Sequence, residues 1–233
     1  MILTFPDLES LSQAAARHIV LTGQRSIDDR GVFELALSGG NTPNRTYELL
    51  GETAGQRDLW ENTHFYWGDE RCVPPDHPQS NYGAARRVLL DALRVPPENI
   101  HRIRAEDPNR HRAAEEYAAI FPAQPDLLLL GMGGDGHTAS LFPGSPALDE
   151  TDERFVATES PKEPRLRITI TPPAIAAAQM IMVLVSGGDK ADALRRVFAP
   201  RGDAHETPAR LVRDAVWLIG GEAAKGFVGK KAT

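Results

Sequence analysis

The residues best suited to chemistry stand in the stretch GMGGDGHTASLFPGSP, which follows the apolar run DLLLL. Asp135 precedes His137 by two residues, and glycines flank both of them. An imidazole can act as a general base near neutral pH, and a carboxylate beside it can orient the ring. The alternative is a tight turn in which Asp135 bonds its own backbone. An acid–base pair is therefore one of two interpretations of this stretch.

A second group of residues could bind an anion. The turn SGGNTP follows the apolar run VFELAL, and the possible ligand contacts in it are Ser38, Gly39, Gly40 and Thr42. We expect a helix to begin there, with Thr42 as its N-cap and Pro43 at its first position. Glycines admit close approach of a ligand, and a helix N-terminus favours phosphate. The nucleotide P-loop ending and the dinucleotide spacing are both missing, so a plain strand-to-helix turn remains the alternative.

Charged residues follow other expected strands. Lys190 stands at a helix start, where a cation opposes the helix dipole unless an anion joins it. Asp69 and Arg71 follow the run FYWG, and Arg165 and Arg167 alternate in RLRIT, so they share one face of a strand. Each could be solvated surface. Taken together with the glycine turns, they form the local positive cluster that a phosphate needs, next to a possible acid–base centre.

These residues need a scaffold that brings strand ends together. The chain alternates helical patterns with short apolar runs. Strands are expected within residues 32–37, 63–70, 126–132, 154–160, 165–171, 179–187 and 214–220. Helices are expected at 6–24, 42–50, 81–93 after a Ser80 cap, 109–121 after Asp107-Pro108, from Thr171-Pro172-Pro173, and at 188–199. This alternation predicts an α/β fold with a largely parallel, helix-covered sheet, whose ligands bind beyond the carboxyl ends of the strands.

Length and composition narrow the class of protein. The 233 residues suit a single domain spanning 1–233, and no run approaches the roughly 18 apolar residues of a membrane span. The first residues, MILTFPDLES, do not resemble a secretory signal, and the single cysteine, Cys72, allows neither an internal disulfide nor a cysteine-based zinc site. A cytoplasmic location is expected. The net charge of −6 argues against nucleic acid as a partner, although a small anion remains possible.

Five motifs in one order resemble the glucosamine-6-phosphate isomerase/6-phosphogluconolactonase family. They are LSGGNTP, WGDERCVPPDHPQSNY, GMGGDGHTASLFPGSP, RITIT and VSGGDKADAL, and the resemblance covers about residues 33–198. It implies a modified Rossmann-like α/β fold, with a central, largely parallel sheet covered by helices on both faces. It also implies hydrolysis of 6-phospho-D-glucono-1,5-lactone to 6-phosphogluconate in the oxidative pentose phosphate pathway, without a metal or cofactor.

The resemblance also implies a role for each residue. His137 would take a proton from water, and Asp135 would support the ring. The substrate, with its 6-phosphate, would be bound by Ser38, Gly39, Gly40, Thr42, Asp69, Arg71, Arg167 and Lys190. Arg167 is preferred to Arg165 because it directly precedes ITIT, as the family's arginine does. Backbone N–H groups of the glycine turns are candidates for stabilising the oxyanion.

Two other functions remain as alternatives. Related deaminases carry Asp-Glu-Tyr at Asp69-Glu70-Arg71, and Asn-Glu-Pro at Leu141-Phe142-Pro143. The missing carboxylate disfavours an isomerase, since ring opening and proton movement need more acid–base groups than ester hydrolysis. A non-catalytic sugar-phosphate sensor would carry a DNA-binding segment, but about one helix precedes the first expected strand. The expected partner is a small sugar phosphate lactone, with no nucleic acid or membrane. Monomer and homodimer both stay open.

Overall fold

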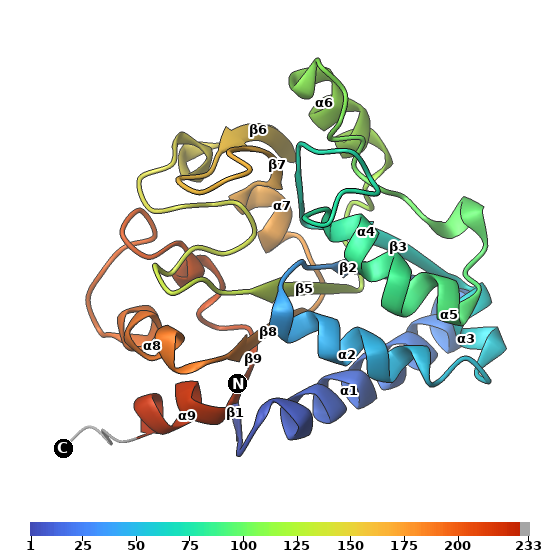
Figure 1. Ribbon diagram of the computed structural model, residues 1–233, viewed down its shortest axis with the longest axis horizontal. Helices are drawn as coiled ribbons and strands as arrows, with labels where there is room; N and C mark the ends of the chain where they lie inside the picture. The colour runs from blue at the N-terminus through green and yellow to red at the C-terminus, as the bar shows by residue number, and fades with distance from the viewer. Residues whose placement is uncertain (229–233) are drawn as a thin grey trace.

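The structure is a computed structural model that describes residues 1–228. Its centre is a parallel six-stranded sheet in the order β1-β9-β8-β5-β2-β3, and a three-stranded antiparallel sheet in the order β4-β7-β6 lies beside it (Figure 1). The strands are β1 Ile2–Phe5, β2 Phe33–Leu37, β3 Thr63–Trp67, β4 Asp69–Arg71, β5 Leu127–Gly131, β6 Phe155–Glu159, β7 Leu166–Ile170, β8 Ile181–Ser186 and β9 Val216–Gly220.

Helices flank the large sheet (Figure 1). The α-helices are α1 Leu8–Arg30, α2 Asn41–Gly51, α3 Arg57–Glu61, α4 Asn81–Ala85, α5 Asp91–Leu93, α6 Arg110–Ile120, α7 Pro172–Ala176, α8 Ala191–Phe198 and α9 Gly221–Val228. A π-helix spans Arg86–Leu90, and 3₁₀ turns span Pro97–Asn99, Pro146–Asp149, Gly188–Lys190 and Pro208–Val212. Among residues 1–228, no helix is both long enough and apolar enough to cross a membrane.

The central strands are nearly continuous apolar runs. In β5, Leu127 to Leu130 are each at most 1% exposed, and most residues of β2, β8 and β9 are also buried. Strands covered on both faces have this composition because neither side of the sheet meets water. The α1 helix packs against β2, β8 and β9, and α9 packs against β1, β8 and β9. The predicted α/β fold with a central parallel sheet is therefore confirmed.

The strand order creates a crevice between β2 and β5. These neighbours pair in parallel, with Leu35 opposite Leu127. Within the large sheet, the next strand after β2 is β3 on one side, and the next strand after β5 is β8 on the other. The connections leaving the two strands therefore diverge, which is the topological switch point where ligands bind in such sheets.

One expectation about strands was wrong. The first strand is β1, which pairs with β9 at the edge of the large sheet, so the chain before β2 is more than one helix. The runs at β6 and β7 form strands as expected, and they join β4 in an antiparallel sheet that the sequence did not indicate. A strand's apolar pattern shows that it packs on a core, but it does not identify the partner strand.

Helix starts agree with the sequence only in part. Ser80 caps α4 as predicted, with its side chain accepting a hydrogen bond from the Gly83 N–H, and α7 begins at Pro172 after Thr171. The prediction of Thr42 as an N-cap was wrong, because α2 already begins at Asn41 with Gly40 in the cap position. The α6 helix begins at Arg110 and is capped by the side chain of Asn109, two residues later than the expected Asp107.

Candidate active site

A cavity of about 460 Å³ opens at the carboxyl end of the parallel sheet. The turns that follow β2, β5 and β8 line it, together with residues of β4. Eight of the ten residues predicted from the sequence line this cavity: Ser38, Gly39, Gly40, Thr42, Asp69, Arg71, His137 and Lys190. Asp135 and Arg167 stand behind this lining, and each contacts or adjoins a residue of it. The structure thus brings residues from four regions of the chain to one site.

Asp135 and His137 form a hydrogen-bonded pair. Oδ1 of Asp135 lies 2.6 Å from Nδ1 of His137 and also accepts the His137 backbone N–H at 3.1 Å. Partial burial acts to raise the pKa of Asp135, but the hydrogen bond and charge of His137 outweigh it and bring the pKa to about 2. The carboxylate is therefore ionised at neutral pH and accepts a hydrogen bond from Nδ1–H. This leaves Nε2 as the ring nitrogen that can act as a base.

Steric contacts require glycines in this turn. A Cβ atom on Gly133 would lie 2.1 Å from the His137 ring and 2.6 Å from Oδ1 of Asp135. The backbone closes on itself here, because Gly133 donates its N–H to the His137 carbonyl at 2.9 Å. Gly136 adopts a φ of +94°, in the region that L side chains rarely occupy. The imidazole can fold back against its own turn only because Gly133 has no side chain.

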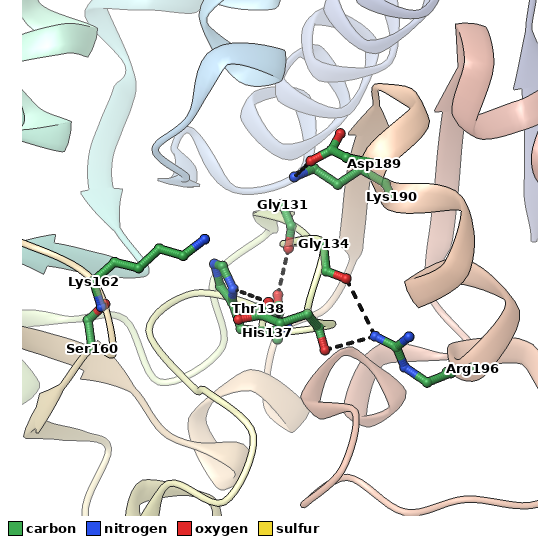
Figure 2. Close-up of polar contacts among 10 residues, drawn as sticks. Gly131, Gly134, His137, Thr138, Ser160, Lys162, Asp189, Lys190 and Arg196 are labelled. Atoms are coloured by element: carbon green, nitrogen blue, oxygen red, sulfur yellow. Dashed lines mark hydrogen bonds and ion pairs between the residues drawn. The ribbon is translucent and has the colours of Figure 1, made fainter.

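Neighbouring side chains hold this turn from both sides (Figure 2). The guanidinium of Arg196, on α8, donates to the carbonyls of Gly134 at 3.4 Å and Asp135 at 3.1 Å. On the other side, the Phe142 ring lies 4.6 Å from the His137 ring, centre to centre. The hydroxyl of Thr138 donates to the Gly131 carbonyl at the end of β5. The ring is therefore positioned by packing as well as by Asp135.

The turn after β2 is fixed by Tyr47. Its buried hydroxyl accepts the Ser38 N–H at 3.0 Å and donates to the Ser38 carbonyl at 2.8 Å. A Cβ on Gly39 would lie 1.9 Å from Oδ1 of Asn81, so a glycine is required. Gly40, with a φ of +114°, makes no side-chain cap with the first turn of α2. The free N–H groups at the start of α2 thus border the cavity and suit an anion.

A buried polar network supports the floor of the cavity. Asp69 is 6% exposed, and its two carboxylate oxygens accept from Ser140 Oγ at 2.6 Å and from Asn81 Nδ2 at 3.1 Å. The neighbouring Glu70 accepts from the backbone N–H groups of Arg71, Asn81 and Tyr82 and from the Ser80 hydroxyl. Burial raises the pKa of Glu70 despite these hydrogen bonds. Glu70 thereby ties β4 to the start of α4, which carries Asn81.

Arg71 and Arg167 lie opposite each other on β4 and β7. Arg71 lines the cavity, donates to the Gln79 carbonyl at 2.6 Å, and has a buried Nε with no partner in the described part of the chain. Arg167 is 6% exposed and donates to the Pro164 carbonyl at 2.8 Å. Burial, and then the positive charge of Arg71, lower the pKa of Arg167. Two adjacent guanidiniums would be stabilised by an anion beside Arg71.

Lys190 reaches the cavity from the loop after β8. Its ammonium lies 2.7 Å from Oδ2 of Asp189, at the start of α8 (Figure 2). Arg165 is exposed and pairs with Glu159 at 3.0 Å, so it points away from the site. Of the two arginines that the sequence left to compare, Arg167 is the one next to the cavity.

Three more residues take part in this geometry: Asn81, Asp189 and Phe142. The sequence did not predict them as site residues. Asn81 stands in the motif containing QSNY, directly after a helix-capping serine, which was a usable signal. Asp189 next to Lys190 could also have been read as its ion-pair partner. The contact of Phe142 with His137 depends on how the loop folds, so no local pattern indicates it. Within residues 1–228, no group of three or more His, Cys, Asp or Glu side chains could hold a metal ion.

Comparisons with known proteins agree with this site. The family model described as glucosamine-6-phosphate isomerases/6-phosphogluconolactonase matches residues 6–219. A 6-phosphogluconolactonase of Synechocystis is 40% identical over 217 residues, covering 87% of this chain and 88% of the relative. One from Nostoc is 39% identical over 234 residues, covering 95% of each.

Solved structures with similar folds agree with these sequence relatives. The 6-phosphogluconolactonase from Trypanosoma brucei superimposes with a TM-score of 0.85 at 29% identity, covering 97% of each chain. A monomeric glucosamine-6-phosphate deaminase superimposes with a TM-score of 0.82 at 22% identity, covering 96% of this chain and 98% of that one, which shows a shared fold. The chain therefore belongs to the glucosamine-6-phosphate isomerase/6-phosphogluconolactonase family.

Proposed function

We propose that the protein hydrolyses 6-phospho-D-glucono-1,5-lactone to 6-phospho-D-gluconate, the lactone step of the oxidative pentose phosphate pathway. One observation carries this proposal. The Asp135–His137 pair faces the same 460 Å³ cavity as the N-terminus of α2, Arg71 and Lys190. A base at one end and an anion site at the other match a phosphorylated ester. The names of the curated relatives point to the same reaction.

Nε2 of His137 acts as the general base in this mechanism. It takes a proton from a water molecule as the water oxygen bonds to C1, and the carbonyl electrons move onto the carbonyl oxygen. When this tetrahedral intermediate collapses, the bond between C1 and the ring oxygen breaks, and the imidazolium returns a proton to that oxygen. The ionised Asp135 stabilises the imidazolium between these steps. The product is an open-chain carboxylic acid, which ionises in water.

The 6-phosphate binds at the opposite end of the cavity. The N–H groups at the start of α2 donate to phosphate oxygens, and Arg71 and Lys190 supply positive charge. Arg167 adds charge from behind Arg71. Arg71 and Lys190 both line the cavity, so both can reach an anion bound there. Thr42 and Ser38 border the same place, while Asp69 orients Asn81 and Ser140.

The wall beside His137 favours hydrolysis over deamination. The position where the related deaminases are expected to carry a carboxylate is Phe142 here, an 8%-exposed ring against the imidazole. A phenyl ring cannot shuttle a proton between adjacent carbons. Water attack on an ester requires only one base, so the site as built is sufficient for hydrolysis.

A direct assay tests the proposal. Purified protein is mixed with freshly made lactone in slightly acidic buffer, which slows spontaneous opening, and 6-phosphogluconate is measured against time. We expect a rate far above the protein-free blank. The same protein incubated with glucosamine 6-phosphate should release no ammonia. A lactone rate equal to the blank would refute the proposed function, and ammonia release would assign the deaminase reaction in its place.

A further inference from the structure

Lys162 lies in the tight turn between β6 and β7, and the backbone of this turn is held at several points. Ser160, which is 2% exposed, donates its N–H to the Arg165 carbonyl at 2.7 Å and accepts the Lys162 N–H on its hydroxyl at 3.1 Å. The Pro164 carbonyl accepts from the Arg167 guanidinium at 2.8 Å. The turn that carries Lys162 is therefore tied directly to an arginine beside the cavity.

This turn stands next to the wall that supports His137. Phe142, whose ring packs on His137, lines a surface groove together with Ser160 and Pro161. The hydroxyls of Ser145 and Thr158 also lie 3.2 Å apart and join the two segments. In Figure 2 the Lys162 side chain extends from the turn toward the His137 ring, while Lys190 approaches from another direction.

The ammonium of Lys162 has no protein counter-ion. Of the three lysines in residues 1–228, Lys190 pairs with Asp189 and Lys225 pairs with Glu222, both at 2.7 Å. Lys162 makes neither an ion pair nor a side-chain hydrogen bond with any described residue. A long, exposed cation is normally free to turn to any nearby carboxylate. Lys162 is instead directed to the imidazole end of the site (Figure 2).

No cation has yet been assigned to stabilise the negative charge that develops at C1, and Lys162 can do so. The cationic residues that line the cavity, Arg71 and Lys190, are assigned to the phosphate, and the charged partner of His137 is the anion Asp135. Water attack on C1 places a negative charge on the carbonyl oxygen, and the product carries a carboxylate at the same carbon. Negative charge that develops in the transition state is stabilised by cations or N–H donors placed around it.

We propose that Lys162 is a catalytic residue whose ammonium stabilises the oxyanion formed at C1 and then contacts the product carboxylate. This inference rests on the proposed lactone hydrolysis. It makes the turn between β6 and β7 a functional part of the site, separate from the phosphate end. Because the contact strengthens as charge develops on the oxygen, Lys162 acts on kcat more than on KM.

The test compares Lys162→Met, Lys162→Arg and the matched control Arg165→Met, which removes an exposed cation from the same turn. Loss of one oxyanion-stabilising group lowers kcat by about 10²–10³-fold when the group is buried. For the exposed Lys162 we expect a decrease of about 10-fold to 100-fold in the Met variant, with KM changed by less than about threefold. The Arg variant should retain part of the rate, and Arg165→Met should match the wild type.

Inhibitor binding separates the two ends of the site. 6-Phosphogluconate carries a carboxylate at C1, whereas glucitol 6-phosphate carries a hydroxyl there and the same phosphate. Lys162→Met should weaken inhibition by the first compound by about tenfold or more and leave the second unchanged. Equal weakening of both would overturn the proposal and place Lys162 at the phosphate. A wild-type kcat in Lys162→Met would also overturn it. An inactive wild type would refute the hydrolase function itself, so the two failures are distinguishable.

Discussion

At the scale of single residues, the site holds a negative charge beside His137 and positive charges on other residues of the cavity. Asp135 holds a negative charge at the imidazole, while Arg71 and Lys190 bring positive charge to the same cavity and Arg167 lies next to Arg71. In the proposed mechanism, this charge distribution orients a phosphorylated lactone with its phosphate on the cations and its carbonyl toward His137. An acidic protein with a net charge of −6 can therefore bind an anion, because the local cluster dominates within about 8 Å at physiological salt.

His137→Ala removes the base and leaves the phosphate end intact. We expect kcat to fall by about 10²–10⁴-fold, the usual contribution of general base catalysis, while inhibition by inorganic phosphate stays near the wild-type level. Steady-state kinetics with fresh lactone measure the first quantity and competitive inhibition in the residual assay the second. Turnover like that of the wild type would show that another group activates the water.

Asp135→Asn keeps the shape and removes the charge. The imidazolium loses its counter-ion, so kcat should fall by about 10²-fold or more. The folded-state pKa of Asp135 is about 2, below the ordinary 3.8, so the carboxylate stabilises the fold above pH ~4 and loses this contribution as the pH falls toward 2. Urea unfolding of both proteins at pH 7 and at pH 3 measures the difference. A difference that does not shrink at pH 3 would contradict this assignment.

Lys190→Ala acts on binding at the other end. In the proposed mechanism its ammonium contacts the phosphate equally in substrate and transition state, so KM should rise by about tenfold with kcat nearly unchanged. The ion pair with Asp189 is also lost, which leaves that carboxylate near the cavity and adds to the effect. Initial rates over a wide range of lactone concentrations separate the two constants. A decrease in kcat alone would mean that Lys190 contacts the reacting centre.

At the scale of elements, the turn after β5 is the part most sensitive to a small change. Gly133→Ala would place a Cβ atom 2.1 Å from the imidazole, so the ring must rotate away from Asp135. We expect kcat to fall by at least about tenfold, since a misplaced base loses most of its effect, while the circular dichroism spectrum is retained. Gly55→Ala is the control, because a Cβ there meets nothing within 4 Å. Equal activity of the two variants would contradict the steric role of Gly133.

The sequence predicted most of these elements because their signals are local. Apolar runs, the cap at Ser80 and the prolines after Thr171 act within a few residues, and the structure bears them out. The pairing of β6 with β7 and β4 depends on contacts between distant segments, so the sequence did not indicate a second, antiparallel sheet. The short β1, exposed along part of its length and followed by Pro6, had too weak a pattern. Phe142 reaches His137 only through the folded loop, and no spacing indicates that contact.

At the scale of the whole molecule, Gly68 joins the two sheets. Its N–H donates to the Leu37 carbonyl of β2 at 3.0 Å, and its carbonyl accepts the Ile170 N–H of β7 at 2.8 Å. A Cβ at this position would contact Leu128 and Ile170 from the two sheets. The buried residues of both sheets also belong to one continuous apolar core. These links support the prediction that residues 1–233 form a single domain, which unfolding can test.

Phe155→Ala tests whether the sheets unfold together. Phe155 lies on β6, is 1% exposed, and packs edge-on against Tyr117 at 4.8 Å and Phe121 at 4.9 Å. Its removal should lower the free energy of unfolding by about 3–5 kcal/mol. The exposed Leu166 on β7 supplies the control, and Leu166→Ala should change that free energy by less than about 0.5 kcal/mol.

The three tryptophans report on the other sheet. Trp60, Trp67 and Trp217 are buried and belong to α3, β3 and β9, and none of them lies on a strand of the antiparallel sheet. If one core spans both sheets, Phe155→Ala shifts the tryptophan fluorescence midpoint and the far-ultraviolet circular dichroism midpoint in urea by the same amount. If the sheets were separate units, the tryptophan midpoint would stay at its wild-type value while part of the dichroism signal was lost earlier. Arg71 and Arg167 belong to the antiparallel sheet and His137 follows the parallel one, so activity should disappear in that same single transition.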